Sequence, residues 1–117
     1  MPRLISTYVH GVLDYGTVAM LLALPRLLKP SSHAAGMLTI AALTTLLYSM
    51  FTRYELGLKK LLPMRVHLAL DGMNEAAFLS APALLRDEDA TVKGALLGIG
   101  LFEVSAALLT DPEDGVD

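Results

Sequence analysis

The amino-acid sequence contains no cysteine and no tryptophan among its 117 residues. Without cysteine, the chain has no disulfide bond, no thiolate metal ligand and no cysteine nucleophile. Charged residues make up only 18% of the chain and aromatic residues 6%, and the formal net charge is −3. Because the chain lacks a basic patch with interleaved aromatic side chains, we expect no nucleic-acid partner.

Motifs of several enzyme classes are also missing. The sequence has no nucleophile elbow around a serine, no glycine-rich phosphate-binding loop and no HExxH pattern. Ser80 has no neighbouring base that the sequence identifies. The motifs therefore do not predict an enzyme of these types.

Apolar residues dominate the chain, at 54% of the composition with a mean hydropathy of +0.54. Residues 34–51 carry no charge, and a run of about 18 such residues is long enough to cross a bilayer. A soluble four-helix bundle needs a charged stripe on every helix, but here the charges gather in the turns. We therefore predict a single membrane domain over residues 1–117, in contact with lipid.

Two stretches of the sequence align at a constant shift of 57 residues, namely 9–28 and 66–85. Nine of the twenty aligned positions are identical, among them His10 with His67, Asp14 with Asp71, and Pro25 with Pro82. Weaker matches follow at a shift of 58, including Thr52 with Thr110. We interpret the pattern as an internal duplication, with repeat one over about 5–57 and repeat two over about 62–115. The copy also argues against a cleaved signal peptide at the apolar start of the chain.

The apolar segments predict an all-α fold, with helices over about 5–27, 33–52, 64–85 and 91–110. The duplication makes this a four-helix transmembrane bundle of two tandem helical hairpins. Each repeat crosses the membrane twice, so the copies are related by a pseudo-twofold axis along the membrane normal. Pro25 and Pro82 should end or bend their helices, because proline lacks an N–H and clashes with the preceding turn.

Basic residues favour an orientation with both termini in the cytoplasm. Five lie on the side of the termini and the central connection, residues 52–63, and four lie on the opposite side. Cytoplasmic loops carry an excess of lysine and arginine. The connection itself is either an interfacial segment, with leucines among the headgroups and lysines in water, or an ordinary loop with some buried leucines.

Three motifs resemble the SPW-repeat membrane proteins: H-G-x-L-D-Y at residues 10–15, P-M-x-V-H-L-A-L-D at 63–71 and T-x-Y-E-L-G at 52–57. The resemblance covers roughly residues 5–110. It departs at the tripeptide that names the family, because residues 24–26 and 81–83 keep the proline but lack the tryptophan. The resemblance implies a small, multi-pass protein of the bacterial plasma membrane, with unknown biochemistry.

The polar residues of the apolar segments predict a shared site. His10 and Asp14 are four residues apart, as are His67 and Asp71, so each pair shares a helix face. If the two faces meet at the axis, these four side chains converge, and further polar residues can join them: Asn74, Glu75 and Glu103. Three interpretations remain open: each histidine bonds its own aspartate in a structural pair, the cluster handles protons or ions, or it binds a divalent metal such as Zn, Mn or Fe.

Gly94 and Gly98 form a small-residue motif that serves helix packing. We expect it to contact the other helices of the bundle rather than a second chain. For the whole protein, the leading hypothesis is a structural or accessory membrane subunit, associated with itself or with other membrane proteins. The alternatives are a small transporter or ion-handling protein, and a metal-binding membrane protein or enzyme.

Overall fold

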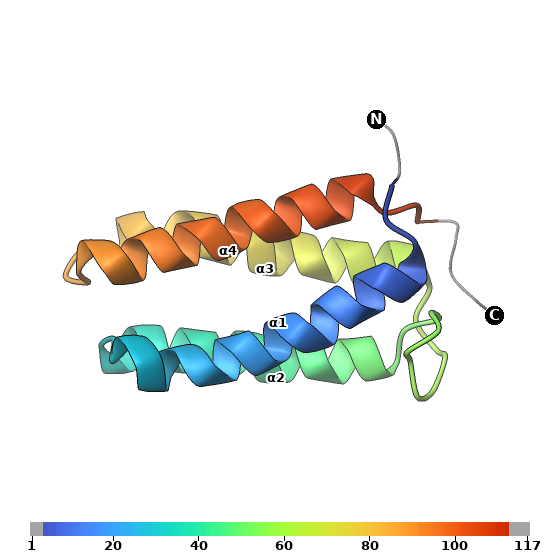
Figure 1. Cartoon of the computed structure of the whole chain (residues 1–117), viewed down its shortest axis with the longest axis horizontal. Helices are drawn as coiled ribbons and strands as arrows, with labels where there is room; N and C mark the ends of the chain where they lie inside the picture. The colour runs from blue at the N-terminus through green and yellow to red at the C-terminus, as the bar shows by residue number, and fades with distance from the viewer. Residues whose placement is uncertain (1–3, 113–117) are drawn as a thin grey trace.

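The computed structural model describes residues 4–112 and folds them into four helices (Figure 1). The helices are α1, Thr7–Leu28; α2, Ser32–Met50; α3, Met64–Leu84; and α4, Ala90–Leu109. Every bound lies within two residues of the predicted range. The all-α prediction is therefore confirmed for the described residues.

Side-chain caps mark the start of three helices. In each, a side-chain oxygen accepts the backbone N–H three residues later: Ser6 from Val9, Ser31 from Ala34, and Asp89 from Val92. A cap of this kind satisfies one of the N–H groups that the first turn of a helix leaves unpaired. Each proline lies close to the C-terminal end of its helix, as predicted: α1 ends three residues after Pro25, and α3 ends two residues after Pro82.

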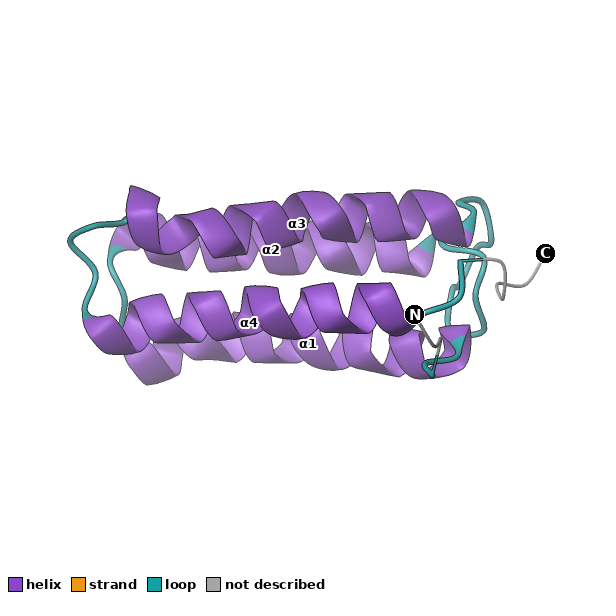
Figure 2. Cartoon of the chain, turned by 90° about the horizontal axis from the view of Figure 1, so that it is seen from above, coloured by secondary structure: helices purple, strands orange, loops and turns teal. Residues whose placement is uncertain are grey.

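The helices form two hairpins that lie along a common long axis (Figures 1 and 2). Packing is close within each hairpin, α1 against α2 and α3 against α4, and sparser between the hairpins. Both hairpin turns lie at one end of the bundle, and the central connection and the two ends of the described chain lie at the other. There the N–H of Ile5 donates to the carbonyl of Leu109 at 3.1 Å, which joins the start of the chain to the end of α4.

The central connection, residues 52–63, is folded against the C-terminal end of α2. Several of its backbone N–H groups donate to the last carbonyls of that helix. A Cβ at Gly57 would overlap a backbone carbonyl of the same loop, so only glycine fits there. Leu58 is exposed at the end of the bundle, whereas Tyr54 is fully buried. The connection is thus an ordered loop that buries one aromatic side chain inside this end of the bundle.

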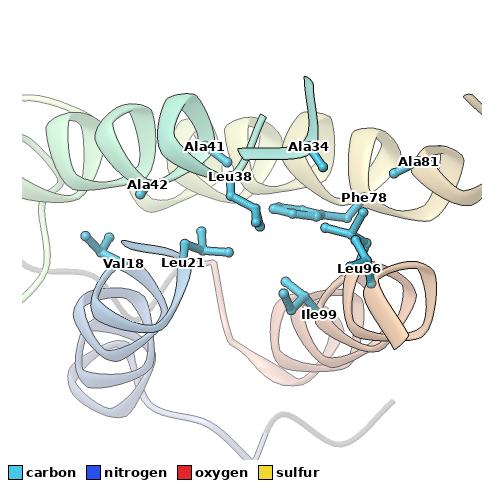
Figure 3. Packing of buried hydrophobic residues seen from close by; sticks show 11 residues of the cluster. Val18, Leu21, Ala34, Leu38, Ala41, Ala42, Phe78, Ala81, Leu96 and Ile99 are labelled. Carbon is cyan, nitrogen blue, oxygen red and sulfur yellow. The ribbon is translucent and has the colours of Figure 1, made fainter. Parts of the chain in front are cut away.

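Apolar side chains fill the half of the bundle nearest the hairpin turns (Figure 3). Each helix contributes at least one fully enclosed side chain: Leu21 from α1, Leu38 from α2, Phe78 from α3 and Leu96 from α4. The cluster therefore joins both hairpins. It leaves the opposite half of the bundle, next to the termini and the connection, for the polar residues.

Among the helices of residues 4–112, three are long and apolar enough to cross a membrane: α1, α2 and α4, with mean hydropathies of 1.4, 1.3 and 1.7. Many of their large apolar side chains point outward, including Ile40 and Leu101. A face of this kind suits lipid rather than water. The remaining helix, α3, is less apolar than these three, since it carries Asp71, Glu75 and several uncharged polar residues.

The expectation that Gly94 and Gly98 pack inside the bundle is wrong. Both residues are exposed, and a Cβ added at either would meet nothing within 4 Å among the described residues. The close approach between α3 and α4 occurs instead at Gly100, where an added Cβ would lie 2.9 Å from Leu79 Cδ2 and 3.2 Å from Phe78 Cβ. The spacing of Gly94 and Gly98 does place them on one face of α4, but a different face of α4 packs against α3.

Replacing Gly100 with valine should destabilise the α3–α4 hairpin, because the new methyl groups overlap Leu79 and Phe78. Overpacking of this kind costs about 1–3 kcal/mol. Gly94→Val is the matched control, since it adds the same side chain to the same helix in open space. The free energy of unfolding in detergent micelles, followed by circular dichroism, measures the difference. Equal losses in the two variants would contradict the assignment of the contact to Gly100.

Candidate functional site

Four ionisable side chains meet in the polar half of the bundle. They are His10 and Asp14 of α1, and His67 and Asp71 of α3, with exposed fractions of 2%, 8%, 0% and 7%. One nitrogen or oxygen atom from each lies within 4.8 Å of the corresponding atoms of the others. The two helix faces that the sequence predicts to be polar therefore meet in one buried cluster, which we call the His/Asp centre.

Within the His/Asp centre, each histidine lies closer to the aspartate of the other hairpin than to its own. His10 Nε2 is 3.0 Å from Asp71 Oδ2 and 3.3 Å from Asp14 Oδ1. His67 Nε2 is 2.9 Å from Asp14 Oδ2 and 3.3 Å from Asp71 Oδ2. The interpretation in which each histidine simply bonds its own aspartate is therefore incomplete: helical spacing permits that contact, but the approach of the two hairpins produces the shorter ones.

Two threonines hold the outer nitrogen atoms of the rings. His10 Nδ1 lies 2.8 Å from Thr110 Oγ1, and His67 Nδ1 lies 2.7 Å from Thr52 Oγ1. Each threonine hydroxyl donates its own hydrogen to the backbone carbonyl four residues earlier, at 2.7 Å in both cases. The hydroxyl oxygens must then accept a hydrogen bond from the rings, so both histidines carry a hydrogen on Nδ1 and turn Nε2 toward the carboxylates.

Two tyrosines donate hydrogen bonds to the carboxylates from outside the centre. Tyr48 of α2 donates to Asp71 Oδ1 at 2.5 Å, and Tyr54 of the connection donates to Asp14 Oδ2 at 2.8 Å. Burial, together with the nearby charge of Asp14, raises the pKa of Tyr54 well above its ordinary value. The phenol therefore keeps its hydrogen and acts as a donor. The connection is held in position by Tyr15, whose hydroxyl donates to the Leu56 carbonyl at 2.9 Å.

The three additional polar residues that the sequence suggests lie around the centre rather than in it. Asn74 donates to Thr45 Oγ1 at 3.0 Å and to Tyr48 Oη at 3.2 Å, so it supports the tyrosine. Glu75 is buried, and its Oε1 has no hydrogen-bond partner among residues 4–112. Glu103 lines a small cavity of about 20 Å³ beside the centre.

Sequence reasoning missed four side chains that complete the site. Thr52 and Thr110 were visible as an aligned pair, but their role depends on contacts that a sequence does not contain. Tyr54 lies within the T-x-Y-E-L-G motif at residues 52–57. The motif singles out this segment but does not predict what the tyrosine contacts. For Tyr48 we find no signal, since it stands in an apolar run as an ordinary aromatic residue.

The electrostatics of the centre depend on charge balance. Two carboxylates removed from water cost several kcal/mol each unless positive charge compensates them. Two positive charges balance the pair, supplied either by two protonated imidazoles or by one divalent cation. The geometry admits both, because the same nitrogen and oxygen atoms face one another in either case.

Comparison with known proteins adds no relative. No protein-family model matches the chain, and neither a curated protein nor a solved structure is similar to it. The SPW-repeat resemblance thus stays a prediction from three motifs, and function has to be argued from the geometry of the site.

Replacing Thr52 or Thr110 with valine should destabilise the fold, because each change leaves a buried Nδ1–H without an acceptor. A buried unsatisfied donor costs about 1–3 kcal/mol. Thr39→Val is the control: its hydroxyl also donates to the carbonyl four residues earlier, but on an exposed face. Unfolding of the three variants in detergent gives the comparison. If Thr39→Val loses as much stability as the other two, the threonines do not hold the rings.

Proposed function

We propose that this protein is a four-span membrane protein whose His/Asp centre binds one divalent transition-metal ion. The observation that carries the proposal is the orientation of both imidazole rings. Each ring donates Nδ1–H to a threonine and directs Nε2 at two buried carboxylates. Metal-binding histidines commonly have this arrangement, since a hydrogen bond at the outer nitrogen fixes the ring and leaves the inner lone pair for the metal.

The donor set suits particular ions. Two imidazole nitrogens and two carboxylate oxygens are suitable ligands for Zn²⁺, Mn²⁺ or Fe²⁺. The carboxylates also have outer partners, because Tyr48 and Tyr54 donate to Asp71 and Asp14. All four candidate ligands are therefore oriented by a second layer of hydrogen bonds, as expected of a metal site.

A purely structural role for the centre uses the same contacts. In that hypothesis two protonated histidines clamp the hairpins, and the protein acts as an accessory subunit. His67 favours the metal: its Nε2 is enclosed and lies 2.9 Å from Asp14 Oδ2, yet it has no partner among the described residues in the direction that an N–H···O hydrogen bond needs. An inward-facing lone pair aimed between carboxylates explains this geometry better than an N–H group.

The membrane arrangement of the proposal includes α3. Its polar residues, such as His67 and Asp71, are buried, whereas Met73 and Leu84 point outward. The outer face of α3 is thus apolar although its mean hydropathy is lower. The two hairpins would then be parallel repeats about a pseudo-twofold axis, which the matching His10–Thr110 and His67–Thr52 contacts support. The distribution of basic residues favours termini in the cytoplasm, and the SPW-repeat resemblance implies that the cell is a bacterium.

Metal content tests the central claim. The protein purified in detergent and supplied with zinc, manganese or ferrous ion should retain one ion per chain by mass spectrometry of the elements. Asp71→Asn should lose it, because a neutral amide replaces a charged ligand while still accepting from Tyr48. Glu75→Gln is the matched control, since it removes a buried carboxyl from the same helix, one turn away from the centre. Wild-type protein that takes up none of the three ions would make the metal proposal wrong and favour the structural clamp.

Reporter fusions test the number of spans. Four spans place both termini on one side of the membrane, whereas three spans without α3 place them on opposite sides. We expect reporters at the two termini to give the same compartment, and reporters inserted in the turn at residues 29–31 or 85–89 to give the other one. Termini in different compartments would remove α3 from the membrane and contradict the parallel repeats.

A further inference from the structure

A long apolar groove lies between α1 and α4, where the two hairpins pack sparsely. Its volume is about 650 Å³, and its walls include Val12, Gly16, Met20, Ala95 and Gly98. The two glycines leave room, since a Cβ at either would meet nothing within 4 Å among the described residues. The volume falls in the range of about 300–1,000 Å³ that is usual for small-molecule sites.

The groove adjoins the small cavity beside the His/Asp centre. Both spaces are lined by Leu13, Thr17 and Phe102. Glu103 and Ala106 are among the residues that line the cavity but not the groove. At about 20 Å³ the cavity has room for one group the size of a water molecule. The apolar groove and a polar cavity for a single small group therefore lie side by side, with the three shared side chains between them.

The cavity arises from a difference between the two repeats. At the shift of 58 that aligns their second halves, Tyr48 corresponds to Ala106. In the first repeat the tyrosine fills its place and donates to Asp71. In the second repeat the alanine methyl leaves the equivalent space open, next to His10 and Glu103. One side of the centre is thus closed by a phenol, and the other can receive a group from outside the chain.

The size and charge of these spaces restrict the occupant. A phosphate or sugar headgroup is too large for a cavity of about 20 Å³. The two positive charges of the centre are already balanced by Asp14 and Asp71, so a carboxylate headgroup beside Glu103 would be a buried charge without compensation. A hydroxyl group fits the space and can donate a hydrogen bond to a carboxylate, whereas a carbonyl oxygen can accept one from a threonine hydroxyl that lines the cavity, Thr17 or Thr45.

We infer that the groove binds a single-chain lipid with one neutral oxygen headgroup, an alcohol or a carbonyl. The hydrocarbon chain lies between α1 and α4, and the oxygen enters the cavity at Glu103. The inference rests on the proposed membrane setting, and it gives the proposed metal centre a substrate class. Entry is lateral, from the hydrocarbon region of the bilayer.

Binding of hexadecanol tests the inference, with palmitate and lysophosphatidylcholine as competitors of similar chain length. Native mass spectrometry of the full chain released from detergent counts bound molecules directly. We expect one hexadecanol per chain, bound about tenfold or more tightly than either competitor. Equal or tighter binding of palmitate or of the phospholipid would overturn the neutral-headgroup assignment.

Two glycine variants locate the site. Gly98→Leu fills the groove and should weaken hexadecanol binding about tenfold or more. Gly94→Leu adds the same side chain one turn away, outside the groove, and should bind as the wild type does. Equal binding by the two variants would overturn the location. A dimer that Gly98→Leu alone dissociates would also overturn the inference, because a second copy would then occupy the groove.

Metal content measured on the same preparations separates this inference from the proposed function. Gly98→Leu should retain the metal while it loses hexadecanol. A protein that binds hexadecanol in the groove without holding metal would refute the metal centre and support the lipid site. A protein that holds metal but binds no hexadecanol would refute the lipid site alone.

Discussion

The cross-hairpin contacts between two histidines and two aspartates determine how the rest of the bundle is arranged. Buried ionised groups cost several kcal/mol each unless they are compensated. Each histidine here lies nearest the aspartate of the other hairpin, and its outer nitrogen is bound by a threonine of the other hairpin. Within each hairpin the contact between histidine and aspartate is longer, at 3.3 Å in both cases. This mutual dependence joins two halves that otherwise approach each other only sparsely.

The helices could be predicted because each is a largely apolar segment of the length that crosses a bilayer. The four residues of the His/Asp centre could be predicted because the same histidine–aspartate spacing occurs twice in the chain. The supporting residues could not. Tyr48 reaches an aspartate 23 positions away and Tyr54 one that is 40 positions away, so their roles arise only from packing. The glycines show the same limit. Spacing places Gly94 and Gly98 on one face, but only the fold reveals that Gly100 meets α3.

The bundle divides into an apolar half near the hairpin turns and a polar half near the termini. The apolar half fixes the distance between the hairpins through Leu21, Leu38, Phe78 and Leu96. The polar half is closed at its end by the connection and the joined chain ends, and the apolar groove between α1 and α4 lies beside it. In the proposed membrane setting, a centre built in this way is shielded from both aqueous phases and faces the hydrocarbon layer. That environment suits chemistry or binding that involves lipid-soluble molecules.

The position of Thr110 has a consequence for synthesis of the protein. It is the last residue of the site along the chain, and it binds the ring of His10, which is the first. A first hairpin inserted alone would present a histidine and an aspartate to lipid without their partners, at about 2.5–3.5 kcal/mol or more for an ionised group. In the proposed membrane setting, stable insertion of the first hairpin therefore depends on the presence of the second.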